Sequence, residues 1–174
     1  MATHQSAASQ SKPLYTAAQK KIRDESGWTL VQGILAPVQF LVFLVSLGLV
    51  LRYLYTGEGQ SAATISIVIK TLTLYTIMIT GAIWEKVVFG VYLFAEGFYW
   101  EDMVSMLVLA LHTAYLFSLY YDWMDTRALM LLALAAYATY VVNAAQFILK
   151  LRAARLQSAA QALTNAGPAM EAAQ

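Results

Sequence analysis

Residues 28–51 read WTLVQGILAPVQFLVFLVSLGLVL, and no charged side chain interrupts them. The apolar core of a bilayer is about 30 Å thick, and an α-helix crosses it with about 20 mainly apolar residues. This stretch therefore predicts a transmembrane helix, and three more apolar stretches follow it along the chain. We expect the four spans at about residues 28–55, 62–84, 103–121 and 128–149. The fold class that follows is all-α, an integral membrane four-helix bundle.

The composition agrees with a membrane protein built around a single domain. Of 174 residues, 60% are hydrophobic and 12% are charged, whereas a soluble domain has about 25% charged residues. We expect a polar cytoplasmic segment over residues 1–27, the four-span domain over 28–152, and a disordered tail rich in Ala and Gln over 153–174. The net charge of +1 argues against nucleic acid as a partner, and the lack of cysteine excludes thiolate chemistry.

The distribution of Lys and Arg predicts how the helices are oriented. Cytoplasmic loops of membrane proteins carry an excess of these residues. The two terminal segments and the link between the second and third spans fall on one side of the bundle, and their basic residues are Lys12, Lys20, Lys21, Arg23, Lys86, Lys150, Arg152 and Arg155. The other side has Arg52 and Arg127 alone. Both termini are therefore expected to be cytoplasmic, which agrees with an even number of spans.

Polar side chains recur on one face of the first span and on one face of the fourth. The first set is Gln32, Gln39, Ser46 and Tyr53, and the second is Thr139, Asn143, Gln146 and Lys150. Hydrogen bonds between helices would explain both sets, and so would the wall of a polar pocket. Both interpretations stay open, and either predicts a polar contact between these two spans. For a pocket, Gln39, Asn143 and Gln146 are candidate substrate-binding residues.

The third span carries the sharpest pattern. Glu101, Ser105 and His112 are spaced so that they share one helical face, and Asp102 lies next to that face. The two carboxylates could simply stabilise the start of the helix, where the helix dipole favours negative charge. A histidine near the middle of a bilayer has three common uses: an inter-helix hydrogen bond, a proton relay, or an axial ligand to the metal of a tetrapyrrole.

A link rich in aromatic and acidic residues joins the second and third spans. Glu85 and Lys86 would form an interfacial ion pair or, with Glu96, the acidic mouth of a binding site. The aromatic residues around that mouth are Phe89, Tyr92, Phe98, Tyr99 and Trp100, of which Tyr99 and Trp100 are candidate substrate-binding residues. Flat aromatic walls with carboxylates suit a large planar ligand. Lys70, in the second span, is expected to reach the opposite interface with its long side chain.

Four long segments resemble one family of enzymes. They are RDESGWTLVQGILAPVQFLVFLVSLGLVLRYLYTGEG (23–59), ATISIVIKTLTLYTIMITGAIWEKVVFG (63–90), FYWEDMVSMLVLALHTAYL (98–116) and LLALAAYATYVVNAAQFILKLRAARL (131–156). These segments are similar to those of the vinyl bacteriochlorophyllide hydratase family, and the resemblance runs over roughly residues 14–156. They are specific to that family and are not a generic transmembrane pattern.

The resemblance implies an enzyme of bacteriochlorophyll biosynthesis in the inner, photosynthetic intracytoplasmic membrane of a phototrophic bacterium. It implies addition of water to the C3 vinyl group of a magnesium chlorin, either chlorophyllide a or 3-vinyl bacteriochlorophyllide, to give a 3-(1-hydroxyethyl) product. Such an enzyme is a carbon–oxygen lyase of the hydro-lyase type. No cofactor is expected, since the substrate carries its own magnesium. The expected pathway partner is a dehydrogenase that oxidises the new alcohol.

The residues themselves supply the candidates for this chemistry, because the resemblance assigns no catalytic residue. We expect Glu101 or Glu85 to protonate the vinyl group and Asp102 to orient the attacking water. His112 is the candidate axial ligand to the magnesium of the substrate, and the protein alone is not expected to bind a metal ion.

Two other classes of function stay open from the residues alone. A non-catalytic pigment-binding assembly protein or light-harvesting accessory subunit would have the same polar groups and would leave the vinyl group unchanged. A small transporter would need a polar pathway across the bilayer, which Lys70 and the amide-bearing faces would supply only in part. The family resemblance favours the hydratase over both.

Overall fold

Helices make up most of the computed structural model, which describes residues 14–171, with side chains described for 14–160. The helices are α1 (Ala17–Glu25), α2 (Gly27–Thr56), α3 (Gln60–Phe89), α4 (Tyr99–Tyr120) and α5 (Thr126–Glu171). Each helix from α2 to α5 is long and apolar enough to cross a membrane. The predicted all-α, multi-pass membrane architecture is confirmed for this part of the chain. The predictions for residues 1–13 and 172–174 lie outside it.

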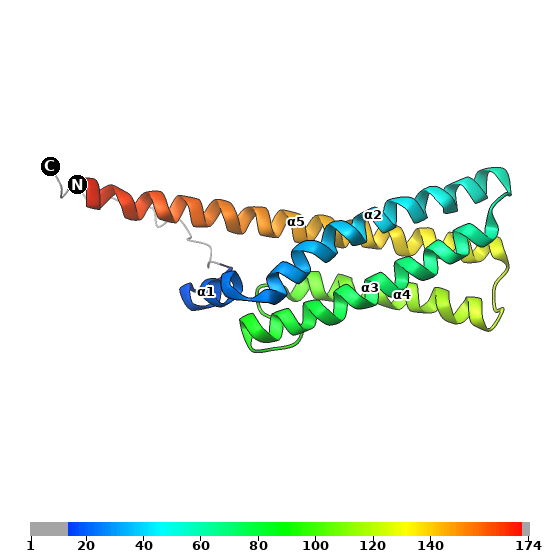
Figure 1. The fold of residues 1–174 in the computed structure, drawn as a ribbon, viewed down its shortest axis with the longest axis horizontal. Coiled ribbons are helices and arrows are strands. Elements are labelled where there is room, and N and C mark those ends of the chain that lie inside the picture. Colours follow the sequence, from blue (N-terminus) through cyan, green and yellow to red (C-terminus); the bar gives the residue numbers. More distant parts are fainter. Residues whose placement is uncertain (1–13, 172–174) are drawn as a thin grey trace, which may run out of the picture.

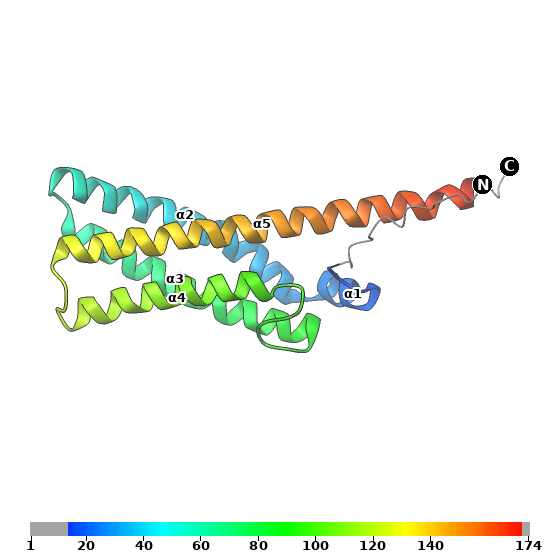
Figure 2. The same cartoon turned by 180° about the vertical axis from the view of Figure 1, so that it is seen from behind.

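Two antiparallel helical hairpins form the bundle (Figure 1). α2 packs along α3 and α4 packs along α5, and these are the most extensive helix pairs. The two hairpins lie side by side and approach each other less closely, through α2 with α5 and α3 with α4. The reverse view shows the same pairing (Figure 2). We call the boundary between the two hairpins the inter-hairpin seam. Side chains pack across it, as Phe43 of α2 does against Tyr137 and Tyr140 of α5.

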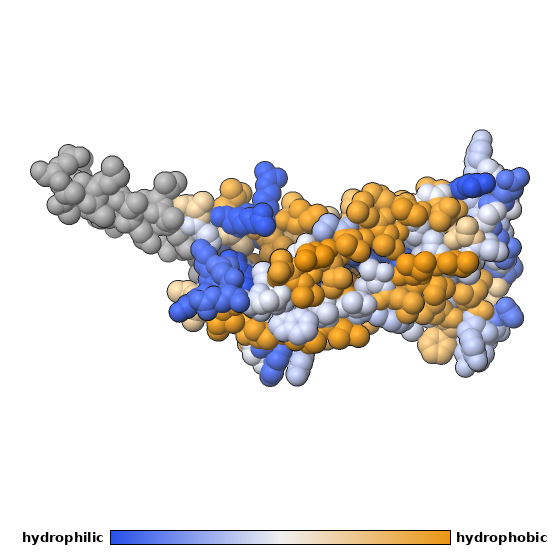
Figure 3. All heavy atoms as spheres, viewed as in Figure 1, coloured by the Kyte–Doolittle hydropathy of each residue, from blue (hydrophilic) through white to orange (hydrophobic). Residues whose placement is uncertain are grey.

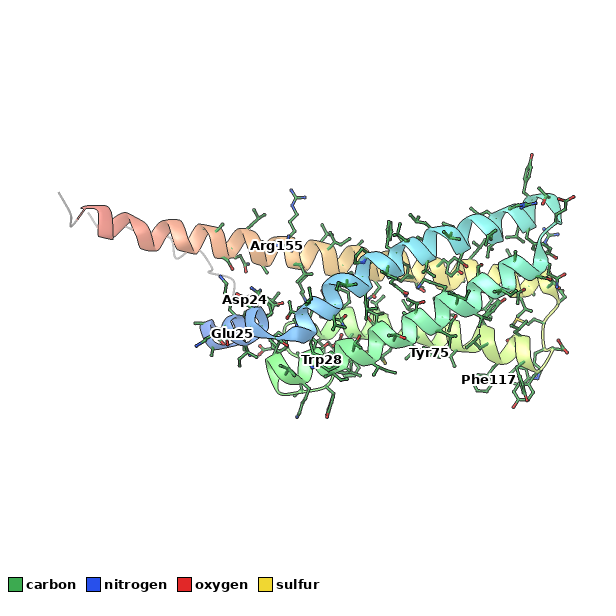
Figure 4. All side chains as sticks on the ribbon, viewed as in Figure 1. Asp24, Glu25, Trp28, Tyr75, Phe117 and Arg155 are labelled. Carbon is green, nitrogen blue, oxygen red and sulfur yellow. The ribbon has the colours of Figure 1, made fainter. Side chains whose placement is uncertain are left out.

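Different segments of the chain lie at the two ends of the bundle. α1 and the last part of α5 lie beyond the same end (Figure 1). Asp24, Glu25 and Trp28 are found near this end together with Arg155, whereas Phe117 lies toward the other end (Figure 4). The start of the first span and the end of the fourth therefore share one side of the bundle.

An apolar belt covers the bundle between these ends. On the face seen in Figure 3, hydrophobic side chains cover the middle and hydrophilic ones gather at both ends. On α2 alone, Leu41, Val45 and Leu51 are 61%, 64% and 49% exposed. Soluble proteins rarely expose large continuous apolar surfaces, whereas lipid tails solvate them well. The belt is what a bundle surrounded by lipid requires.

The link between α3 and α4 is shorter than predicted. α3 runs on to Phe89 and α4 begins before the predicted third span, so the link shrinks from residues 85–102 to 90–98. No glycine or proline lies between the predicted end of the span at residue 84 and Gly90, whose φ of 83° ends the helix in a left-handed conformation. Glu85, Glu101 and Asp102 therefore lie on the helices themselves, whereas Glu96 lies in the link.

The outer ends of the chain are also more helical than expected. α5 continues past Leu149 to Glu171, through much of the tail for which disorder was predicted. Ala, Gln, Leu and Arg are strong helix formers, which explains the continuation. The segment over residues 1–27, predicted only to be polar, contains α1, which a capping box starts at Thr16.

A hydrogen bond crosses the inter-hairpin seam near its middle, and a second one lies beside it within the α2–α3 hairpin. The hydroxyl of Ser46 lies 2.7 Å from that of Ser66 and 2.6 Å from that of Tyr137. Ser46 belongs to α2 and Tyr137 to α5, so the predicted polar contact between the first and fourth spans is present. It is formed by these hydroxyls and not by the amides of Gln39 and Asn143.

The Ser46→Ala variant should be less stable in detergent than the unchanged protein. It removes two buried hydrogen bonds and leaves the Tyr137 hydroxyl without this partner, at a cost of about 1 kcal/mol. Thr73→Ala is the matched control, because the exposed Thr73 hydroxyl donates to the Ile69 carbonyl of its own helix. Thermal unfolding followed by circular dichroism should give a lower midpoint for Ser46→Ala alone. Equal midpoints for the two variants would contradict a stabilising role for this contact.

Candidate active site

Two carboxyl groups meet at the end of the bundle where α3 finishes and α4 starts. Glu85 and Asp102 are both buried, at 5% and 3% exposed. Their carboxyl groups lie close enough to interact directly. Two carboxylates held this close repel each other, which favours a state in which one of them carries a proton. The structure thus brings together two of the residues predicted to be catalytic, and we call them the carboxyl pair.

The link 90–98 folds back over the carboxyl pair. The backbone N–H of Phe94 donates to Asp102 at 2.7 Å, and that of Ala95 donates to Glu85 at 3.2 Å. Phe94 has a φ of 61°, in the left-handed region that residues other than glycine seldom adopt. Two successive amides therefore bind one carboxyl group each, and these contacts hold the backbone in a strained conformation.

The third predicted carboxylate, Glu101, is occupied by an ion pair. It accepts a hydrogen bond from the ammonium group of Lys150 on α5, with 2.5 Å between Nζ and Oε2. Lys150 also donates to the backbone carbonyl of Gly97 in the link. The cation therefore joins α5, the start of α4 and the link at a point close to the carboxyl pair.

Asn143 fixes α5 against the same end of α4. Its amide nitrogen donates to the backbone carbonyl of Glu101 at 2.9 Å, and its oxygen accepts from the Ser105 hydroxyl at 3.2 Å. Gln146 lies between Asn143 and Lys150 along α5, and its side-chain oxygen is buried without a hydrogen-bond partner. Of the two α5 residues predicted to bind substrate, Asn143 has its amide engaged in helix packing, and Gln146 keeps an unused acceptor.

An aromatic cluster encloses this end of the bundle. The ring of Phe98, which is 1% exposed, has its centre within 5.8 Å of the ring centres of Trp84, Phe89 and Phe147. Tyr15, ahead of α1, stacks on Phe89 at 5.6 Å, so the N-terminal segment covers the cluster. Burial raises the pKa of the Tyr15 phenol, which stays neutral. Excluding bulk water in this way strengthens the electrostatic interactions inside.

Tyr99 and Trp100, predicted to line the mouth of the site, lie on the outer face of α4. They are 45% and 71% exposed, and their rings pack edge to face. Successive residues of a helix are about 100° apart, so a helix that turns Glu101 and Asp102 inward turns the two preceding residues outward. Their place is that of interfacial aromatic anchors, and they do not form a wall around the carboxyl pair.

His112 lies deeper in the bundle, about 15 Å from Asp102 along α4 at about 1.5 Å per residue. It is 1% exposed, and its Nδ1 lies 2.8 Å from the carbonyl oxygen of Val108. A carbonyl only accepts hydrogen bonds, so Nδ1 carries the hydrogen and Nε2 presents a lone pair. Nε2 has no hydrogen-bond partner. The predicted common face of Glu101, Ser105 and His112 is confirmed, since all three are buried.

Lys70 was expected at the membrane interface, and this expectation is wrong. Its side chain is fully buried, its ammonium group lies 3.9 Å from the centre of the Tyr140 ring, and Nζ has no hydrogen-bond partner. The sequence held the signal, because Lys70 lies about 15 Å from the start of α3 at about 1.5 Å per residue, beyond the reach of its side chain. Gln39 on α2 is also buried, with both amide atoms unpartnered.

Comparison with known proteins identifies the family of this chain. A family model described as 2-vinyl bacteriochlorophyllide hydratase matches residues 15–153. The chain belongs to this hydratase family. A relative of that name from Rhodobacter capsulatus is 65% identical over 150 residues, which are 86% of this chain and 87% of the relative. Another, from Cereibacter sphaeroides, is 64% identical over 151 residues, which are 87% and 94% of the two chains.

The family match covers the whole site, from Tyr15 to Lys150, and confirms the resemblance seen in the sequence. No solved structure matches the chain. The carboxyl pair, the Glu101–Lys150 ion pair and the buried His112 therefore all lie within the segment that this family shares.

In this hydratase family member, the Glu101–Lys150 ion pair should show strong coupling in a double-mutant cycle. Lys150→Met leaves a buried carboxylate without its cation and should destabilise the protein by up to about 3 kcal/mol. Adding Glu101→Gln removes the unpaired charge, so the double variant should be more stable than Lys150→Met alone. Denaturation of the four proteins measures the coupling. Additive effects of the two substitutions would show that the pair contributes nothing as a pair.

Proposed function

We propose that the carboxyl pair of Glu85 and Asp102 is the acid–base machinery of a vinyl hydratase. Family membership supplies the reaction, in which the chain adds water to the vinyl group of a bacteriochlorophyllide. The observation that supports the location is the close approach of two buried carboxyl groups. Such a pair offers a proton and a base at one point, as the hydration of a carbon–carbon double bond requires.

The reaction begins with transfer of the shared proton to the terminal carbon of the vinyl group. The π electrons form the new C–H bond, and the carbon next to the ring becomes a cation that the conjugated macrocycle delocalises. The oxygen of water then attacks this carbon. The water loses a proton to the carboxyl pair, and a 1-hydroxyethyl group remains. The pair ends with the one proton that it held at the start, so neither a redox cofactor nor ATP is consumed.

The groups around the carboxyl pair support this sequence of steps. After the first proton transfer both members are anionic, and each keeps a backbone N–H donor from the link, from Phe94 or Ala95. Preorganised donors of this kind stabilise charge that develops during a reaction. Glu101, which Lys150 neutralises, serves in this scheme as a positioning residue. The role of acid passes to Glu85, the other sequence-predicted candidate.

This scheme places the enzyme among the hydro-lyases and requires no cofactor beyond the magnesium that the substrate carries. The group attacked is the C3 vinyl group of chlorophyllide a or 3-vinyl bacteriochlorophyllide. The product is a secondary alcohol next to the ring, which suits a following dehydrogenase as a pathway partner.

The proposal also places the protein in the inner, photosynthetic intracytoplasmic membrane with both termini in the cytoplasm. α1, which carries Lys20, Lys21 and Arg23, and the last part of α5 lie beyond the same end of the bundle (Figure 1), where Arg155 of α5 is also found (Figure 4). Such an excess is typical of the cytoplasmic side. The carboxyl pair then lies toward the cytoplasm.

Neutralising either member of the carboxyl pair should reduce turnover by at least about 100-fold, the lower range of general acid–base catalysis. Glu85→Gln and Asp102→Asn keep the size of each side chain and its ability to accept the backbone N–H. Membranes from a host without bacteriochlorophyll genes, each containing one variant, are incubated with chlorophyllide. Chromatography and mass spectrometry then measure the gain of one water.

Glu58→Gln is the control for these variants, because Glu58 is an exposed carboxylate in the turn between α2 and α3. It should leave turnover unchanged. Near-normal turnover by Glu85→Gln or Asp102→Asn would overturn the assignment of the carboxyl pair. If the unchanged protein bound pigment without altering it, the non-catalytic pigment-binding protein would be the better description.

Single cysteines can test the orientation, because the chain has none of its own. Lys20→Cys on α1 should react with a membrane-impermeant maleimide from the cytoplasmic side only. Glu58→Cys should react from the opposite side only. Intact cells and inverted vesicles give the two readouts, and the reverse pattern would overturn the orientation while leaving the fold intact.

A further inference from the structure

Gln39, Lys70 and His112 are among the buried side chains of the described bundle whose polar atoms have no hydrogen-bond partner. The atoms are both amide atoms of Gln39, Nζ of Lys70 and Nε2 of His112. The side chains are 2%, 0% and 1% exposed. Buried polar groups are nearly always paired, and a cation within a bilayer is especially costly. The mechanism proposed above uses none of the three.

Lys70 and His112 lie in one part of the inter-hairpin seam, and Gln39 lies one helical turn from a residue that packs there. Lys70 of α3 lies over the ring of Tyr140 of α5, and the ring of His112 of α4 packs on Tyr137 at 5.8 Å. Phe43 of α2, one turn from the glutamine, packs on these two tyrosines at 5.4 and 5.0 Å. We call this tyrosine-lined region the central site.

The unpartnered atoms define the chemistry of a ligand that would satisfy them. Nε2 of His112 presents a lone pair, and a neutral imidazole is the commonest protein ligand of metal ions. Lys70 has only donors, so it requires an oxygen acceptor. Tyr137 and Tyr140 offer flat surfaces to another ring. A magnesium chlorin combines a central metal with a free axial position, oxygen atoms on its edge, and a flat apolar macrocycle.

We propose that the central site binds the macrocycle of the substrate, with Nε2 of His112 as the axial ligand to its magnesium and Lys70 as a hydrogen-bond donor to an oxygen on the edge of the ring. The identity of the ligand rests on the proposed function. The vinyl edge of the ring then faces the carboxyl pair, and the oxygen-bearing edge faces away from it.

The positions of the two sites suit one ligand that touches both. Asp102 and His112 are about 15 Å apart along α4. Helix side chains tilt toward the start of their own helix, so His112 on α4 leans toward the carboxyl pair. Glu85, near the end of the antiparallel α3, leans back toward the central site for the same reason. Both tilts shorten the gap that the edge of the macrocycle must cross.

Entry of the ring requires the two hairpins to separate, because packed side chains fill the central site. The pairing within each hairpin is extensive, and the pairing between hairpins is sparser. Separation therefore breaks few helix contacts, among them the hydrogen bond from Ser46 to Tyr137. The unpartnered polar atoms gain partners when the pigment enters, which offsets the loss.

Pigment binding without turnover tests the role of His112. The probe is a chlorophyllide whose vinyl group has been reduced to ethyl, so that no hydration can occur, with its magnesium-free form for comparison. The full-length protein in detergent should bind the magnesium form roughly tenfold more tightly, an amount typical of one added contact. His112→Leu should lose this preference without weakening the metal-free form. His112→Gly should regain the preference when imidazole is added.

The role of Lys70 is tested with the same probe as the free acid and as its methyl ester. Lys70→Met should weaken binding of the free acid roughly tenfold. An equal effect on the ester identifies a ring carbonyl as the acceptor, and an effect on the acid alone identifies the carboxylate. No effect on either form would remove Lys70 from the proposal.

Thr113→Val is the matched control for these variants. Thr113 follows His112 on α4, but its hydroxyl lies 2.8 Å from that of Tyr75, on α3. Its variant should bind the probe normally. The central site would be refuted if the unchanged protein bound both metal forms equally, or if His112→Leu kept the metal preference. Binding as expected in a protein that does not hydrate chlorophyllide would refute the proposed function and leave the central site standing.

Discussion

Lipid cannot hydrogen-bond a side chain, and the arrangement of this protein depends on that constraint. Glu85, Glu101 and Asp102 lie on membrane-spanning helices, and all three are buried in the bundle. Their partners must come from other helices or from the link. Polar contacts therefore set the positions of the helices relative to one another. Lys150 joins α5 to the start of α4. Apolar packing alone would allow many other registers.

The two polar regions along the inter-hairpin seam differ in how many of their polar atoms have partners within the protein. At the end with the carboxyl pair, backbone amides and Lys150 pair the charged groups within the protein. In the central site, Gln39, Lys70 and His112 keep polar atoms without partners. Preorganised groups suit a reaction centre, because little has to move while charge develops. Polar groups without partners suit a binding site, because the ligand supplies the missing partners.

The periodicity of the sequence predicted which residues share a helix face. It did not predict which helices pack against each other. The common face of Glu101, Ser105 and His112 follows from 3.6 residues per turn, so the sequence predicted it. The contact of Glu85 with Asp102 depends on the register between α3 and α4 and on the folding of the link, which no local pattern encodes. The prediction placed Glu85 and Asp102 in the link because it ended each span at the last apolar residue. A buried carboxylate with partners allows a helix to continue past that point.

The link over the carboxyl pair has a consequence for how the enzyme communicates with its surroundings. The amides of Phe94 and Ala95 each bind one member of the pair. A backbone N–H binds a carboxylate more strongly than a carboxylic acid, so the pull on this turn passes from one amide to the next as the proton changes place. Phe94 has a strained left-handed φ, which these two hydrogen bonds hold in place. The backbone of this turn is thus coupled directly to the protonation state of the carboxyl pair.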